Sequence, residues 1–270
     1  ACVDMAYMSQ LSGKDTEALV TELAGVIFFD PVEREWQTAD EYLSGNVREK
    51  LRIAQSYAAP GFPKEDHVDY RMNVAALEQA QPKDLDASEI EVRLGATWID
   101  KDYIQQFMVE TFDTPFYLQR HIQVNYSPFS AEWNITGKSQ PSYNDVNAYM
   151  TFGTDRANAY KILEDTLNLR DVRIYDTVTD PDGKERRVLN SKETTLAQQK
   201  QQAIKDAFAE WIWKDPDRRQ ALVTRYNELF NSTRPREYDG SHITFSGMNP
   251  EIKLREHQLN AVAHILCGGN

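Results

Sequence analysis

The chain has 270 residues, enough for one large or two small domains with a substantial core. Hydrophobic residues make up 41% of it and aromatic residues 11%, which excludes a disordered chain. No apolar run reaches the about 18–20 residues of a membrane helix, so no membrane partner is expected. The two cysteines, Cys2 and Cys267, stand at opposite ends of the chain. They predict neither a disulfide framework nor a metal site, and a cytoplasmic setting is the simplest expectation.

Charge is distributed unevenly along the chain. Residues 1–155 contain 12 Lys and Arg against 25 Asp and Glu, a net charge of −13. Residues 156–270 contain 18 against 17, a net charge of +1. Only the second part is therefore expected to face a phosphate backbone without strong repulsion.

The first 58 residues predict a winged-helix-like segment. The expected elements are helices at 4–11 and 16–23, then strands at 26–29 and 35–37. Gly13 breaks the first helix, and Asp15 is a suitable cap for the second. Two short helices followed by a hairpin are typical of a winged helix. A small helical packing module remains an equal alternative, because Lys14 is the only base beside the second helix.

Residues 59–250 predict a mixed accessory domain with a basic second part, and the fold class of the whole chain is α+β, helix-dominated with short strands and hairpins. The linker expected before this domain is 58–63, with two prolines and a glycine, and Thr154 is expected to cap the helix at 156–167. The expected helices are 44–54, 70–79, 100–108, 145–150, 156–167, 193–213 and 216–230. The expected strands are 90–94, 122–124, 132–135, 173–178, 186–189 and 243–245. The turn Asp180-Pro181-Asp182-Gly183 marks the clearest hairpin.

Basic residues concentrate in and after this hairpin. The candidate DNA-binding residues are Lys184, Arg186, Arg187, Lys192, Arg218 and Arg219. Bases at a hairpin tip can straddle phosphates, and Trp211, Trp213 and Tyr226 offer rings on which bases can stack. The alternative is that the bases decorate amphipathic helices while the tryptophans belong to the core.

The end of the chain carries Leu254, Arg255 and Gln258 in a Leu-Arg-x-x-Gln pattern on an expected helix that runs into Gly268-Gly269. An amide such as that of Gln258 can both donate and accept a hydrogen bond, as the edge of adenine requires. The pattern resembles the segment just upstream of the phosphate loop in superfamily-2 helicases. The resemblance implies that residues 251–270 begin a helicase core, with Gln258 and Arg255 at its nucleotide, and that the chain is a piece of a longer protein.

Three further stretches, 38–51, 94–99 and 244–250, resemble the large DNA methyltransferase–helicase fusion proteins of phages and mobile elements, similar to DarB-like antirestriction proteins. The resemblance implies a connecting region between a methyltransferase-like domain and a helicase domain, which would be its partners in the same chain. ATP and Mg²⁺ are then expected for the full-length parent, and no cofactor and no catalytic residue for this piece.

Two functions follow from these patterns. The first is a non-catalytic module that engages or positions DNA upstream of an ATP-dependent motor. The second is a protein-interaction scaffold that holds the methyltransferase and helicase domains together and makes no DNA contact of its own.

Overall fold

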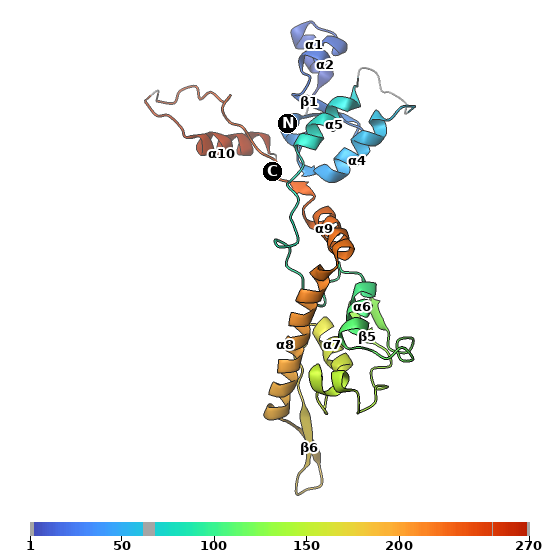
Figure 1. Ribbon diagram of the computed structural model, residues 1–270. Helices are drawn as coiled ribbons and strands as arrows, with labels where there is room; N and C mark the ends of the chain where they lie inside the picture. Colours follow the sequence, from blue (N-terminus) through green and yellow to red (C-terminus); the bar gives the residue numbers. More distant parts are fainter. Residues whose placement is uncertain (1–2, 62–67, 250, 269–270) are drawn as a thin grey trace. The chain divides into compact units, whose positions relative to one another are not determined.

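The computed structural model describes residues 3–61, 68–249 and 251–268 (Figure 1). The fold is α+β and helix-dominated, as predicted, and each strand of the described residues pairs with one antiparallel partner. The chain divides into two compact units. Unit 1 comprises residues 1–84 and 227–270, and unit 2 comprises residues 85–226.

The division differs from the one expected after residue 58. The helices of unit 1 are α1 (Met5–Ser12), α2 (Thr16–Glu22), α3 (Ala39–Tyr42), α4 (Val47–Ala58), α5 (Tyr70–Gln79) and α10 (Glu256–Cys267). Its strands are β1 (Ile27–Asp30), β2 (Glu35–Thr38), β3 (Gly45–Asn46) and β8 (Thr233–Arg234). The expected linker connects α4 and α5, which pack side by side and share the buried Ala54 and Leu77, so no domain boundary falls there. Residues 62 and 63 of that linker lie outside the described residues.

The first four elements form as the sequence predicts. Asp4 and Asp15 cap α1 and α2 by accepting hydrogen bonds from backbone N–H groups two or three residues into each helix. Gly13 ends α1 with a φ of 68°, a left-handed conformation that glycine adopts without a steric penalty. β1 and β2 pair as a hairpin in which Phe29 stands opposite Trp36.

The later part of the chain returns to unit 1 through several contacts. β8 pairs with β3, and Arg48 donates from Nε to the carbonyl oxygen of Asn231 at 2.9 Å. The Arg236 guanidinium lies 2.8 Å from an Asp40 carboxylate oxygen. These contacts join residues that are about 190 positions apart, and such long-range pairing is not visible in local sequence patterns.

Unit 2 packs its helices and one hairpin around a single large core. Its helices are α6 (Lys101–Thr111), the π-helix η1 (Asn147–Thr151), α7 (Ala159–Leu167), α8 (Ser191–Lys214) and α9 (Pro216–Phe230), the last of which continues into unit 1. Its strands are β4 (Val124–Ser127), β5 (Glu132–Ile135), β6 (Tyr175–Thr179) and β7 (Glu185–Leu189). The fully buried Phe107, Tyr160 and Phe208 come from α6, α7 and α8 and mark the centre of the core.

Several expected elements differ in the structure. Residues 90–94 and 243–245 form no strand, and the expected helix at 145–150 is the π-helix η1. Gly95 has a φ of 90° and its Cα approaches the Leu167 carbonyl so closely that a Cβ would lie 2.4 Å away. This packing against the end of α7 leaves no room for a β-ladder there.

Helix caps also differ from the sequence prediction. Asn158, and not Thr154, caps α7, while Asn46, and not Ser44, caps α4. Thr38 makes no capping hydrogen bond to α3. Leu254 precedes α10, so the last helix begins two residues later than the expected pattern. Among the described residues no helix is both long enough and apolar enough to cross a membrane.

Candidate functional site

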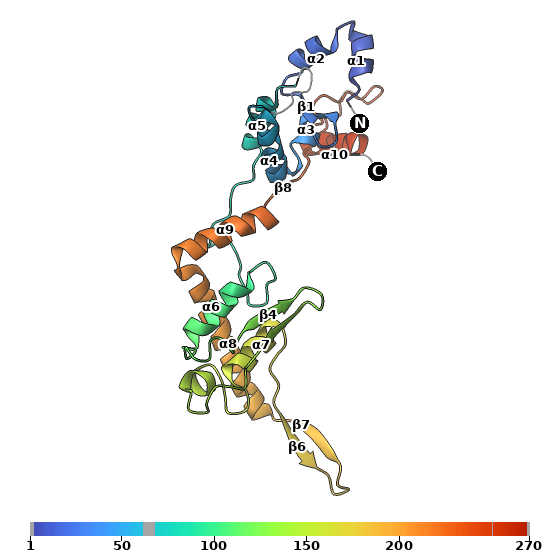
Figure 2. The same ribbon diagram turned by 90° about the vertical axis from the view of Figure 1, so that its right-hand side faces the viewer.

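The β6–β7 hairpin projects beyond the N-terminal end of α8, away from the rest of unit 2 (Figures 1 and 2). Every residue of β7 is exposed, and Thr177 stands opposite Arg187 while Val178 stands opposite Arg186. Since neighbouring residues of a strand point to opposite faces, Arg186 and Arg187 lie on the two faces of the ribbon. A two-stranded ribbon of this kind has the dimensions that the major groove of DNA admits.

The hairpin holds its arginines by local contacts. The Arg187 guanidinium lies over the Tyr175 ring, 4.7 Å from its centroid, and Arg186 lies 3.1 Å from an Asp180 oxygen. The base of the hairpin is tied to the body by Asp176, which accepts from Arg156 at 2.8 Å and from Asn190 at 2.8 Å. The hydrogen bond from Arg156 lowers the pKa of Asp176, so this anchor is charged at neutral pH.

Acidic residues lie among these bases. Residues 175–190 contain Lys184, Arg186 and Arg187 against Asp176, Asp180, Asp182 and Glu185, a net charge of −1. Lys192 is exposed in the first turn of α8, beside the hairpin. Attraction to a phosphate backbone is therefore limited to three or four side chains and is not a broad basic field.

Arg218 and Arg219 do not belong to this surface. Arg218 is 7% exposed, and donates from Nε to the carbonyl oxygen of Ile212 and from Nη2 to that of Trp211. Arg219 donates from Nε to the Trp213 carbonyl oxygen at 2.8 Å. Both side chains satisfy carbonyls at the end of α8 that lack helical partners, so their role is structural. The 24 residues of α8, about 36 Å of helix, separate them from the hairpin.

The rings expected to stack on bases are also engaged within unit 2. Trp211 packs against Phe107 and Phe208, and its Nε1 donates to Glu110 at 2.6 Å. Tyr226 packs edge-on against Trp98. The alternative reading, in which these rings belong to the core, is the correct one.

The N-terminal helices and hairpin carry an acidic surface. Residues 1–37 contain two bases and seven acids, a net charge of −5. One of those bases, Lys14, pairs with Glu22 at 2.6 Å. The second helix and the β1–β2 turn are the elements with which a winged helix contacts DNA, and here they present Glu17, Glu22 and Glu33.

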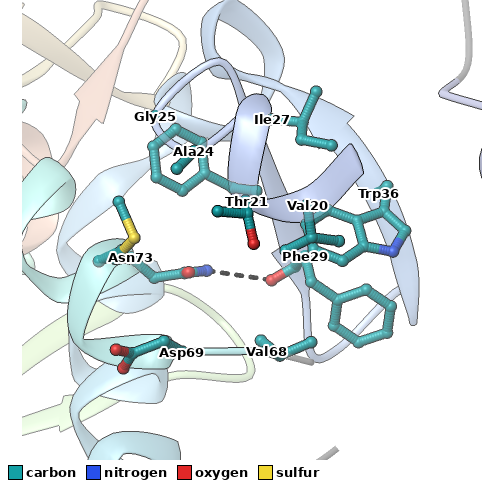
Figure 3. Close-up of a pocket in the computed structure, with 12 residues that line it drawn as sticks. Val20, Thr21, Ala24, Gly25, Ile27, Phe29, Trp36, Val68, Asp69 and Asn73 are labelled. Atoms are coloured by element: carbon teal, nitrogen blue, oxygen red, sulfur yellow. Dashed lines mark hydrogen bonds between the residues drawn. The ribbon is translucent and has the colours of Figure 1, made fainter. Parts of the chain in front are cut away.

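A groove with a cavity volume of about 250 Å³ lies beside these elements (Figure 3). Its apolar wall is made by Val20, Ala24, Ile27, Phe29, Trp36 and Met72. On its floor the buried Asn73 of α5 donates from Nδ2 to the Phe29 carbonyl oxygen at 3.0 Å, the contact drawn as a dashed line. The sequence analysis missed this site, and its only local signal was a buried asparagine between apolar positions of α5.

The groove continues along α5. A second hollow of about 840 Å³ shares Gly25, Phe28, Asp69 and Met72 with the first and extends past Ala76. Together the two hollows form a continuous apolar surface within unit 1, long enough for a peptide segment and not only for one side chain.

The expected nucleotide contacts lie at the start of α10. Gln258 is exposed, and its Oε1 accepts a hydrogen bond from the backbone N–H of Arg255 at 2.9 Å. This contact stabilises the first turn of the helix. The amide nitrogen and the second lone pair of Oε1 still fit an adenine edge. Among the described residues, no three His, Cys, Asp or Glu side chains form a group that could hold a metal ion.

Two family models match the chain. One describes the winged-helix domain of a probable helicase and matches residues 1–37, which are α1, α2, β1 and most of β2. The other describes a domain of unknown function, DUF8437, and matches residues 93–232, which correspond closely to unit 2. No curated protein and no solved structure matches. Since the second match covers more than half of the 270 residues, the chain belongs to the DUF8437 family, preceded by a helicase-associated winged-helix segment.

Proposed function

We propose that the chain is a non-catalytic accessory module of a DNA helicase, and that it engages DNA through the β6–β7 hairpin of unit 2. The match of residues 1–37 to the winged-helix domain of a probable helicase supports the link to a helicase. The observation that carries the DNA contact is the exposed ribbon with Lys184, Arg186 and Arg187, joined by Lys192 at its base.

The hairpin also explains why the contact belongs to unit 2. The N-terminal helices and hairpin present acids where a DNA-binding winged helix presents bases, so phosphates are repelled there. On the β6–β7 ribbon, Arg186 and Arg187 point to opposite faces and can reach phosphates on both walls of a groove.

Fluorescence anisotropy of the 270-residue chain with duplex, forked and single-stranded DNA tests the proposal. Three or four phosphate contacts on duplex DNA give a slope of about −3 to −4 for log affinity against log salt. The variant with Lys184→Glu, Arg186→Glu and Arg187→Glu is expected to lose binding at every salt concentration.

A matched control changes the same charge elsewhere in unit 2, with Lys205→Glu, Lys214→Glu and Arg225→Glu, all exposed on α8 and α9. This control is expected to keep most of the affinity. Equal losses in the two triple variants would contradict a hairpin site, because only the net charge would then matter. No binding at low salt would contradict DNA engagement altogether.

We further propose that the parent protein joins this module to a methyltransferase-like domain and an ATP-dependent motor, as in the DarB-like fusion proteins. In that parent Gln258 and Arg255 would lie at the adenine of ATP, with Mg²⁺ bound by residues outside this chain. Photocrosslinking of 8-azido-ATP to the parent, compared with its Gln258→Ala variant, tests this role, and unchanged labelling would contradict it.

A second candidate function is a scaffold that holds neighbouring domains and makes no DNA contact. The acidic surface of residues 1–37 favours it, since that surface suits a basic protein partner better than a nucleic acid. Failure of the anisotropy experiment would leave this function as the better account.

A further inference from the structure

We infer that the groove between α2, the β1–β2 hairpin and α5 is a docking site for a protein segment with apolar anchor residues and flanking Lys or Arg. The site lies in unit 1 and is independent of the hairpin proposed to engage DNA. The argument rests on the shape of the groove, on its built floor and on its charge.

Shape and size point to a peptide. The first hollow, at about 250 Å³, is smaller than the roughly 300–1,000 Å³ of small-molecule sites and suits one or two side chains. The second hollow continues it along α5, so a segment can place an anchor at Trp36 and further apolar residues beside Ala76. Met72 lies where the hollows meet and is 44% exposed, and a flexible thioether adapts to varied partner side chains.

The floor of the groove is fixed before a partner arrives. The hydrogen bond from Asn73 to Phe29 joins α5 to β1, and Phe29 packs edge-on against Trp36 at a centroid distance of 5.5 Å. A preformed floor reduces the ordering cost of binding.

Charge selects the partner. Glu17 lies one helical turn before Thr21 on the same face of α2, and Asp69 lies at the opposite wall. The surrounding residues 1–37 carry a net charge of −5, and Lys14, their base nearest to α2, is paired with Glu22. Arg71 stands at the second hollow but is paired with Asp69 at 2.7 Å. Flanking Lys or Arg residues are therefore favoured at the α2 end, and phosphates are not.

The test uses the whole chain and a fluorescein-labelled nonapeptide, three lysines, Leu-Leu-Trp and three lysines. Binding is expected by anisotropy at low salt and is expected to weaken at least tenfold in Thr21→Trp, which fills the groove from an exposed lining position. Glu17→Lys is expected to weaken it severalfold, while Thr21→Ser and the exposed Glu251→Lys keep it. The same peptide with glutamates in place of lysines is expected not to bind.

Three results would overturn the inference. These are unchanged affinity in Thr21→Trp, equal binding of the glutamate-flanked peptide, and duplex DNA binding that Thr21→Trp abolishes. Circular dichroism confirms that each variant is folded. The hairpin triple variant is expected to bind the peptide normally and the groove variant to bind DNA normally, so failure of one proposal is distinguishable from failure of the other.

Discussion

The guanidinium of Arg218 lies 3.6 Å from the centroid of the Trp211 ring and caps the helix on which that ring stands. One arginine therefore closes the end of α8, directs the chain into α9 and covers an aromatic ring of the core. Asp215 completes the corner by accepting from the Arg218 backbone N–H at 2.8 Å. A side chain used in this way stabilises unit 2 and has no group left for a phosphate.

Arg218→Ala is expected to lower the free energy of unfolding of unit 2 by about 2–4 kcal/mol, since charged hydrogen bonds and a ring contact are lost together. Arg218→Lys restores little, because an ammonium cannot reproduce the planar fork. Urea unfolding followed by tryptophan fluorescence measures both. Arg219→Ala, at an exposed site, is the control and is expected to cost less than about 1 kcal/mol. A loss of DNA affinity in folded Arg218→Ala would contradict the structural role.

Asn73→Ala is expected to destabilise unit 1 by about 1–3 kcal/mol, because the Phe29 carbonyl loses its partner and a buried space opens. The neighbouring Met72→Ala, at a half-exposed position, is the control and is expected to change stability by less than about 1 kcal/mol. Chemical unfolding of both variants provides the comparison. Equal stabilities would show that α5 does not depend on this hydrogen bond.

Gly153→Ala is expected to destabilise unit 2 by about 1–3 kcal/mol or more. A Cβ at this position would lie 2.0 Å from the Ala148 carbonyl oxygen and 2.7 Å from the Ala159 nitrogen, and neither backbone atom can move freely. Gly183→Ala, in the open hairpin turn, meets no atom and is expected to cost only the about 1–2 kcal/mol of a left-handed residue. Thermal unfolding monitored by circular dichroism at 222 nm distinguishes the two. A smaller loss in Gly153→Ala than in Gly183→Ala would contradict the close approach.

Alkaline pH is expected to weaken unit 2 through Tyr160. Burial raises the pKa of Tyr160 to about 12, against an ordinary value of 10.0. Between these values the folded protein keeps a proton that the unfolded chain releases, so the free energy of unfolding falls as pH rises from about 10 to about 12. The slope is at most about 1.4 kcal/mol per pH unit.

Urea unfolding between pH 9 and 11.5 measures this dependence. Tyr160→Phe is expected to remove it in unit 2, while a similar dependence from Tyr42, whose pKa burial also raises to about 12, remains in unit 1. A steep dependence that persists in unit 2 after Tyr160→Phe would contradict the assignment.

Local chemistry made much of this protein readable from its sequence. Asp4, Asp15 and Asp100 cap helices as predicted, because a carboxylate beside free N–H groups needs no distant partner. The turn 180–183 specifies the β6–β7 hairpin by its own glycine and proline. The α+β class and the winged-helix pattern at the N-terminus follow from the same short-range rules.

Only the tertiary structure decided which residues meet. Arg218 and Lys192 are both bases after the hairpin in sequence, but α8 places them at opposite ends and buries only the first. The return of β8 to β3 made unit 1 discontinuous, and the approach of α5 to β1 created the groove at Asn73. Each depends on pairing between distant segments, which no local pattern specifies because the free energy of those contacts arises only when the chain has folded.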